Sequence, residues 1–178
     1  MRSPQKPLSL HIAVPDLSNT TAGLVGEHLA TAAILQRGWA CSMAQQDAFD
    51  LIANMGRECY RVQVRSCCWS KRFVHNRQSK STLQFPVGKG GNKRFPTYDD
   101  YDILCLVSSE QRGCFFMPIS SVDKIKLTLP ASHFSDPERE IDSWDQTIRI
   151  LRDELTKSAT MRNNRARNGS SSNCQLSP

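Results

Sequence analysis

The order of apolar and polar positions along the chain predicts an α/β fold. A first helix is expected from Thr20 or Thr21 to Gly38, a typical C-terminal residue, with a buried stripe of Leu24, Val25, Leu29, Ala32, Ala33 and Gln36. Segments 38–43, 103–107, 114–119 and 125–129 are expected to form strands. A second helix opens at 135–138, and its apolar stripe consists of Ile141, Trp144, Ile148, Leu151 and Leu155.

The stretch 49–65 predicts a β-hairpin between the first strand and the later ones. Two β-prone runs, 49–53 and 59–65, are separated by a short loop that contains Asn54 and Gly56. Side chains alternate along a strand, so Gln63 and Arg65 lie on the face opposite to Val62 and Val64. With a pivot near Gly56, Asp50 is expected opposite Val62 and Gln63, and Asp50, Gln63 and Arg65 then converge on one small site.

This convergence has two interpretations. A carboxylate, an amide oxygen and a cation side by side suit a hard metal ion that prefers oxygen ligands, next to a positive group for a water or a phosphate oxygen. The alternative is a half-buried hairpin with an ordinary polar face. Asp47 lies too early in the chain to belong to the strand, so Asp50 is the candidate acid.

Composition sets the outer limits. A chain of 178 residues with 39% hydrophobic residues can bury one good core, so one domain is expected. We find no apolar run of membrane-spanning length and no secretory signal, and therefore expect a cytoplasmic protein without a membrane partner. The seven cysteines show no C-x-x-C pair that would indicate zinc, and we expect reduced thiols without chemistry.

The positive charge is concentrated in one segment. The net charge is +6, yet residues 57–94 contain ten basic residues against one acid. Such a block is typical of a surface that binds a phosphate backbone, although a solvated basic loop is the alternative. The glycines at 88–91 do not match a nucleotide-binding loop. The candidate DNA contacts are Lys71, Arg72, Arg77, Lys80, Lys89, Lys93 and Arg94.

The chain is therefore divided into three parts. Residues 1–19 are expected to form a loose N-terminal arm, and residues 20–157 the folded domain. A mobile basic loop, residues 66–97, is inserted in that domain. Residues 158–178 contain arginines, no acid and few hydrophobic residues, so a disordered basic tail is expected.

The motif around the hairpin resembles that of the PD-(D/E)XK nuclease superfamily. In that pattern an acid opens one strand and an acid-x-Lys follows on the next, and here the corresponding residues are Asp50-Leu-Ile-Ala and Gln63-Val64-Arg65. The chain is most similar to the homing endonucleases of group I introns, in which Gln replaces the second acid, and more distantly to archaeal Holliday junction resolvases. The likeness spans about Thr20 to Leu129.

The resemblance implies a restriction-endonuclease-like core with a mixed central sheet flanked by helices. It implies a Mg²⁺-dependent endonuclease that hydrolyses double-stranded DNA and acts as a homo-oligomer, either a dimer or a tetramer. Asp50, Gln63 and Glu27 on the first helix would hold the metal with the backbone carbonyl of Val64. Glu27, Asp50, Gln63 and Arg65 would be the catalytic residues.

One residue departs from the family pattern. Arg65 stands where the family has Lys, and an arginine stays protonated and cannot act as a base. The alternatives are therefore a slow nuclease and a relative that binds DNA without cutting it. A nucleic-acid-binding module that uses only the basic segment, and an RNA-binding accessory protein, are further alternatives.

Overall fold

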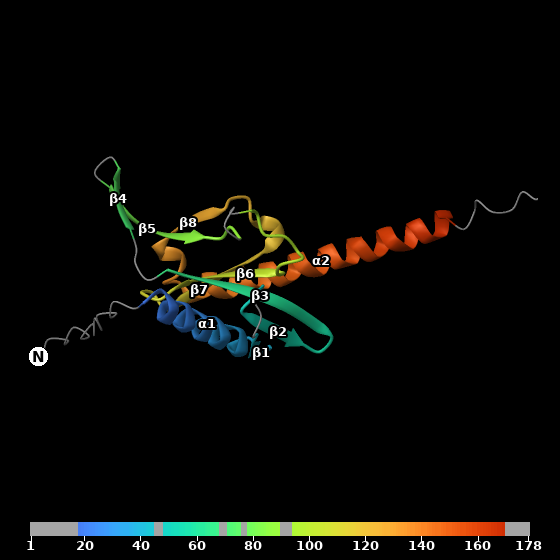
Figure 1. Cartoon of the computed structure of the whole chain (residues 1–178), viewed down its shortest axis with the longest axis horizontal. Coiled ribbons are helices and arrows are strands. Elements are labelled where there is room, and N and C mark those ends of the chain that lie inside the picture. Colours follow the sequence, from blue (N-terminus) through green and yellow to red (C-terminus); the bar gives the residue numbers. More distant parts are fainter. Residues whose placement is uncertain (1–17, 45–47, 68–70, 76–77, 90–93, 170–178) are drawn as a thin grey trace, which may run out of the picture.

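A computed structural model describes residues 18–44, 48–67, 71–75, 78–89 and 94–169 of the chain. Two sheets and two long helices make up this part (Figure 1). The strands are β1 (Ala40–Met43), β2 (Leu51–Met55), β3 (Glu58–Cys67), β4 (Lys71–His75), β5 (Gln78–Pro86), β6 (Ile103–Ser108), β7 (Gly113–Pro118) and β8 (Lys126–Pro130). The helices are α1 (Asn19–Gln36) and α2 (Pro137–Gly169), with short 3₁₀ turns at Ile119–Ser121 and Ala131–His133.

The central sheet is mixed, as the sequence predicts. Its strand order is β1-β2-β3-β6-β7, and β3 and β6 are parallel while the other neighbours are antiparallel. One face packs on α1 and α2, and the other packs on β5 and β8 of a three-stranded sheet whose order is β4-β5-β8. β6 is buried at every position because both faces of the sheet are covered, which explains its continuous apolar sequence.

The β2–β3 hairpin has the predicted register. Leu51 pairs with Val62 and Met55 with Glu58, and Gly56 takes a positive φ of 63° in the turn. A glycine adopts this backbone conformation without the steric cost that a side chain would bring. The register places Asp50 next to the Val62–Gln63 pair, as expected, and its N–H donates to the Val62 carbonyl at 3.0 Å.

Helix α1 faces the sheet mainly with small residues, and only part of the predicted stripe is buried. Ala22, Gly26, Ala30, Ala33 and Ile34 are buried, whereas Leu24 of the predicted stripe is 49% exposed. A Cβ added at Gly26 would lie 1.7 Å from Ser66 Oγ and 3.0 Å from Ser66 Cβ on β3, so an alanine there would displace the Ser66 side chain. The helix begins one or two residues earlier than expected, with the Ser18 hydroxyl accepting from the Thr21 N–H at 3.2 Å.

The first half of α2 packs on the sheet and covers the edge of β7. Trp144, Ile148 and Leu151 are buried as predicted, whereas the two ends of the predicted stripe, Ile141 and Leu155, are exposed. Side chains of the helix accept the outward N–H groups of β7: Cys114 N–H donates to Glu140 at 2.7 Å, and Phe116 N–H donates to Ser143 at 3.1 Å.

The second half of α2 differs from the expected tail. The helix continues to Gly169, so residues 158–169 are helical where disorder was expected, and 170–178 lie outside the described residues. Neither Pro nor Gly occurs between Pro137 and Gly169, so nothing in the backbone chemistry ends the helix earlier.

The segment expected as a mobile basic loop forms strands. β4 pairs with β5, and β5 pairs with β8, where Leu83 and Phe85 are buried against the central sheet. Apolar residues at alternate positions of β5 therefore explain the strand. The expected N-terminal arm falls almost wholly on residues that are not described. None of the described helices is long and apolar enough to cross a membrane.

Candidate metal-binding active site

Asp50, Gln63 and Val64 meet where β2 begins beside β3. The Asp50 Oδ2 atom accepts from the backbone N–H of Val64 at 2.6 Å and from the Gln63 side-chain amide. Gln63 Nε2 also lies 3.4 Å from the Val64 carbonyl oxygen. The carboxylate and the amide therefore share one face of the sheet, as the hairpin register predicts.

This geometry can accommodate a cation. A single nitrogen atom, Gln63 Nε2, reaches both the Asp50 carboxylate and the Val64 carbonyl oxygen. A half-turn of the amide would turn Gln63 Oε1 toward these two oxygens, and an ion lying among the three would meet a carboxylate, a carbonyl and an amide ligand. Carboxylate, carbonyl and amide oxygens are ligands for Mg²⁺ and Ca²⁺. No three His, Cys, Asp or Glu residues cluster within the described residues, so the site would depend on such neutral oxygens.

Glu27 lies on α1 close enough to Asp50 for their charges to interact. Burial, and then repulsion from the Asp50 carboxylate, raises the pKa of Glu27, while neighbouring His28 lowers it in part. The close contact of Gly26 with Ser66 holds this turn of the helix against β3. The structure thus brings together Glu27 and Asp50, the two acids that the sequence assigned to the metal, and a cation between them would relieve their repulsion.

Arg65 is half-buried beside the same carbonyl. Its Nη1 donates to the Val64 oxygen at 3.1 Å. The guanidinium therefore lies next to the point that a cation would occupy, and in this arrangement it offsets part of the partial negative charge on the carbonyl oxygen. Of the four residues that the sequence assigned to catalysis, Asp50, Gln63 and Arg65 meet at the Val64 backbone, and Glu27 lies close enough to Asp50 for their charges to interact; their roles stay predictions.

Tyr101 is a residue near the site that the sequence did not single out. Its ring is fully buried, and its hydroxyl has no hydrogen-bond partner among the described residues. Burial raises the pKa of Tyr101 to about 12, with Arg65 lowering it and Asp100 and Asp50 raising it, so the hydroxyl lies near the site. An aromatic residue just ahead of a strand carries no motif, and only the fold reveals this position.

Lys89 and Arg94 make internal ion pairs, although the sequence predicted them as DNA contacts. Arg94 binds Asp100 through two bonds of 2.7 Å, and Lys89 lies 3.6 Å from the same carboxylate. Lys89 also donates to the Ala48 carbonyl at 2.6 Å. These bonds lower the pKa of Asp100, chiefly through Arg94. Through its bond to Ala48, Lys89 connects Asp100 to the segment that leads to Asp50.

The other predicted DNA contacts are placed only in part. Lys71 and Arg72 lie on β4 and Lys80 on β5. Arg77 and Lys93 lie outside the described residues. The hairpin thus carries its basic positions on two strands that project beyond the body of the protein (Figure 1).

Asp102 is an ion-pair residue that directly precedes β6. It accepts from the Arg61 backbone N–H at 2.8 Å and binds the Arg61 guanidinium at 2.9 and 3.1 Å. Hydrogen bonding to Asp102 raises the pKa of Arg61. This pair fixes β3 to the start of β6, away from Asp50.

Two solved structures are similar to this chain. The structure of I-Ssp6803I, a bacterial homing endonuclease, matches with a TM-score of 0.51 and 16% identity, covering 80% of this chain and 99% of that one. The structure of Hjc, a Holliday junction resolvase from Archaeoglobus fulgidus, matches with a TM-score of 0.40 and 13% identity, covering 63% of this chain and 86% of that one. Curated protein sequences give no match.

A family model decides the assignment. The model of the PD-(D/E)XK endonuclease family matches residues 18–141, which include α1, the β2–β3 hairpin and all the residues around Asp50. At 16% identity the homing endonuclease structure supports the fold, a mixed sheet flanked by helices, and does not by itself assign an activity. This chain belongs to the PD-(D/E)XK endonuclease family.

Proposed function

We propose that the protein is a Mg²⁺-dependent endonuclease that hydrolyses phosphodiester bonds of double-stranded DNA. One observation carries the proposal: a single point beside Asp50 lies within reach of its carboxylate and of the Val64 carbonyl, with Arg65 bound to the same carbonyl. Glu27 lies close enough to Asp50 for their charges to interact. Mg²⁺ is commonly held by one or two carboxylates, with water and substrate phosphate completing its shell. Two acids and two neutral oxygens fit that requirement.

Each residue has a distinct part in the proposal. A bound Mg²⁺ would lower the pKa of a water and neutralise charge on the phosphate. Asp50 anchors the ion, and the Val64 N–H fixes the orientation of its carboxylate at 2.6 Å. Gln63 turns its amide to offer Oε1. Arg65 releases the Val64 carbonyl and places its planar guanidinium against the phosphate oxygens, where it stabilises charge without transferring a proton.

The DNA is proposed to lie along the β4–β5 hairpin. Lys71, Arg72 and Lys80 lie on its two strands, and Arg77 and Lys93 complete the basic segment in the sequence. Cutting both strands of a duplex requires two active sites, so we propose a homo-oligomer. We also propose that the protein acts in the cytoplasm. Lys89 and Arg94 are assigned to the internal ion pairs with Asp100 instead of DNA.

The test is plasmid cleavage by the purified protein in Mg²⁺ with and without a chelator. Nicking or linearisation is expected in Mg²⁺, none with chelator, and none for Asp50→Ala. Asp99→Ala is the matched control, because Asp99 is an exposed acid outside the site. Cleavage by Asp50→Ala at the natural rate would refute the assignment of the site.

A second candidate is a relative that binds DNA without cutting it. The contact between Arg65 and the Val64 carbonyl favours this alternative, because the guanidinium, which stays protonated, already binds the carbonyl oxygen that the metal would need as a ligand. In that case the natural protein leaves plasmid intact while retaining salt-sensitive binding that is indifferent to chelator. Arg65→Lys separates the two: a shorter, more flexible ammonium frees the carbonyl, and cleavage that appears only in this variant identifies an impaired nuclease.

A further inference from the structure

The C-terminal half of α2 extends beyond the body of the protein (Figure 1). Its last described contacts to the body are the ion pair of Arg152 with Glu58, at 2.8 and 2.9 Å, and the hydrogen bond from Tyr98 to Glu154. Leu155 is 62% and Met161 72% exposed, and every described side chain between them is exposed. We call residues 156–169 the helical arm.

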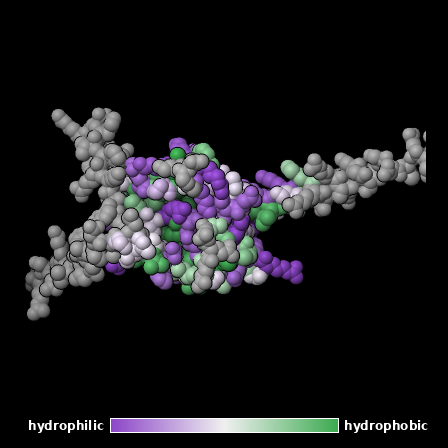
Figure 2. Space-filling model, in the orientation of Figure 1, coloured by the Kyte–Doolittle hydropathy of each residue, from purple (hydrophilic) through white to green (hydrophobic). Residues whose placement is uncertain are grey.

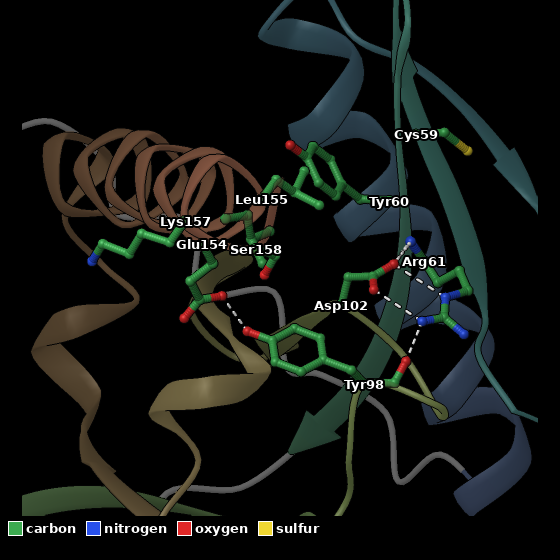
Figure 3. Close-up of a pocket in the computed structure, with 10 residues that line it drawn as sticks. Cys59, Tyr60, Arg61, Tyr98, Asp102, Glu154, Leu155, Lys157 and Ser158 are labelled. Carbon is green, nitrogen blue, oxygen red and sulfur yellow. Dashed lines mark hydrogen bonds and ion pairs between the residues drawn. The ribbon is translucent and has the colours of Figure 1, made fainter. Parts of the chain in front are cut away.

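A pocket of about 560 Å³ lies at the root of the arm (Figure 3). Tyr98 and Glu154 join across it, and the Arg61–Asp102 pair lies on the β3 side. Lys157 points away from these residues, and none of the described acids pairs with it. The body therefore anchors the helix up to Glu154 and makes no described contact with the first cation of the arm.

The arm carries positive charge without any acid. Its cations are Lys157, Arg162, Arg165 and Arg167, and no Asp or Glu follows Glu154 in the sequence. It is also rich in weak helix formers: Thr156, Ser158, Thr160, Asn163, Asn164 and Asn168. The hydroxyls of Thr156 and Thr160 bond only to carbonyls of their own helix, at 2.9 and 3.0 Å. Such a helix gains little stability by itself, so a bound partner would stabilise it.

The helical register shows what kind of partner fits. Trp144, Ile148 and Leu151 form the stripe of α2 that packs on the sheet. At the same spacing the stripe continues through Leu155 to positions 158, 162 and 165, which are Ser, Arg and Arg. An apolar seam for another helix or a second subunit would need hydrophobic residues there. The stripe becomes cationic instead, which suits a polyanion. The body of the protein from which the arm extends is drawn as a space-filling model in Figure 2.

We propose that the helical arm is a second DNA-binding element, which contacts the phosphate backbone of the duplex beside the segment that is cut. The inference rests on the proposed DNA substrate, and it concerns residues beyond 141, where the family model ends. Arg57 at the tip of the β2–β3 hairpin is exposed, and its neighbour Glu58 pairs with Arg152 of α2, so Arg57 adds a cation at the root of the arm. Phosphate contacts of this kind position a protein on DNA without reading sequence.

The distance between arm and active site limits where this contact falls. From Gln63 to Cys59, which lines the pocket at the root, β3 covers about 13 Å at 3.3 Å per residue. The arm adds about 21 Å, from roughly 14 residues at 1.5 Å each. Together these two lengths come to about 34 Å, without the width of the pocket between them, which is roughly one turn of duplex DNA.

The experiment measures the salt dependence of duplex binding by the full chain in chelator, with Asp50→Ala present so that no DNA is cut. The arm variant carries Arg162→Gln, Arg165→Gln and Arg167→Gln. The control removes three exposed cations from the body, with Lys124→Gln, Arg139→Gln and Arg149→Gln. A third variant replaces the three arm arginines by lysine, which retains the charge.

If the arm binds DNA, its glutamine variant lowers the slope of log affinity against log salt by about 0.9 for each phosphate that the arm no longer neutralises, up to about 3. The affinity for a duplex of about 30 base pairs falls at least about tenfold near 0.1 M salt, and the affinity for one of about 10 base pairs falls less. The lysine variant binds like the parent, and the body control changes the slope by less than the arm variant.

Three outcomes would overturn the inference. The first is an unchanged salt slope in the arm variant, including the case where only helix content falls, since cations also stabilise a helix C-terminus. The second is an equal loss of affinity in the arm variant and the body control. The third is a different oligomeric mass in solution, without DNA, for the arm variant than for the parent, which would assign the arm to subunit contacts. If the glutamine variant of the arm lowers the salt slope but the natural protein does not cleave plasmid, only the nuclease proposal is refuted. If the natural protein cleaves plasmid but the arm variant leaves the slope unchanged, only the proposed role of the arm is refuted.

Discussion

Replacing Gly26 by alanine tests whether the close approach of α1 to β3 positions the site. The added Cβ would lie 1.7 Å from Ser66 Oγ, 3.0 Å from Ser66 Cβ and 3.6 Å from Val64 Cγ1. Overpacking of this kind costs about 1–3 kcal/mol, whereas alanine in place of glycine within a helix gains about 1 kcal/mol. Gly26→Ala is therefore expected to lower the free energy of unfolding by up to about 2 kcal/mol.

Gly23→Ala is the matched control. Gly23 lies one turn earlier in α1 and has no atom within 4 Å of an added Cβ. This variant gains the higher helix propensity of alanine over glycine without a steric clash, so it is expected to be more stable than the natural protein by about 1 kcal/mol. The two variants should then differ by about 1–3 kcal/mol, a difference from which the helix propensity cancels.

Denaturant unfolding and plasmid cleavage are the two assays. Glu27 follows Gly26, so Gly26→Ala is expected to reduce cleavage more than Gly23→Ala. Ser66→Ala in the Gly26→Ala background removes the nearest atom, and the Ser66 hydroxyl has no hydrogen-bond partner among the described residues, so partial recovery of stability is expected. Equal or greater stability of Gly26→Ala relative to Gly23→Ala would refute the packing argument.

Three further predictions concern the charges. Gln63→Glu places a second carboxylate beside Asp50, so it is expected to raise divalent-cation affinity at least about tenfold and to destabilise the metal-free protein; calorimetric titration with unchanged affinity would contradict this. Because the pKa of Glu27 is raised, it retains its proton to higher pH, so cation affinity should rise with pH through that pKa, and Glu27→Gln should flatten the profile of affinity against pH. The pKa of Asp100 is lowered chiefly by Arg94, so it stabilises the fold above its unfolded pKa of about 3.9 and this stability is lost as pH falls. Arg94→Gln should therefore unfold at a higher pH on acidification, as circular dichroism would show, and an unchanged midpoint would refute the role of the pair.

The hairpin and its polar face could be predicted from the sequence because both depend on local rules. Alternation with a period of two fixes which of Gln63 and Val64 faces the core, and Gly56 marks the turn. These rules were sufficient to place Asp50 beside Gln63. The relation of Glu27 to Asp50 required the family pattern, since a helix and a strand far apart in the chain share no local signal.

Other features could not be predicted because they depend on long-range packing. Leu24 of α1, which hydropathy assigned to the core, is exposed, and the closest approach of the helix to β3 is made by Gly26 instead. The positive charge of 66–97 concealed the strands β4 and β5. Lys89 and Arg94 count as cations in the sequence, yet both pair with Asp100, whose single carboxylate offsets one of their two charges.

The cover that α2 places over β7 limits how the protein can associate. Unpaired backbone groups at the border of a sheet invite strands from other chains, and this is a common route to aggregation. Glu140 and Ser143 occupy the donors of Cys114 and Phe116 on that border, so a foreign strand would first have to displace a helix. Any growth of the central sheet by strand addition must therefore proceed from β1, where only the four residues of Ala40–Met43 are available as a template.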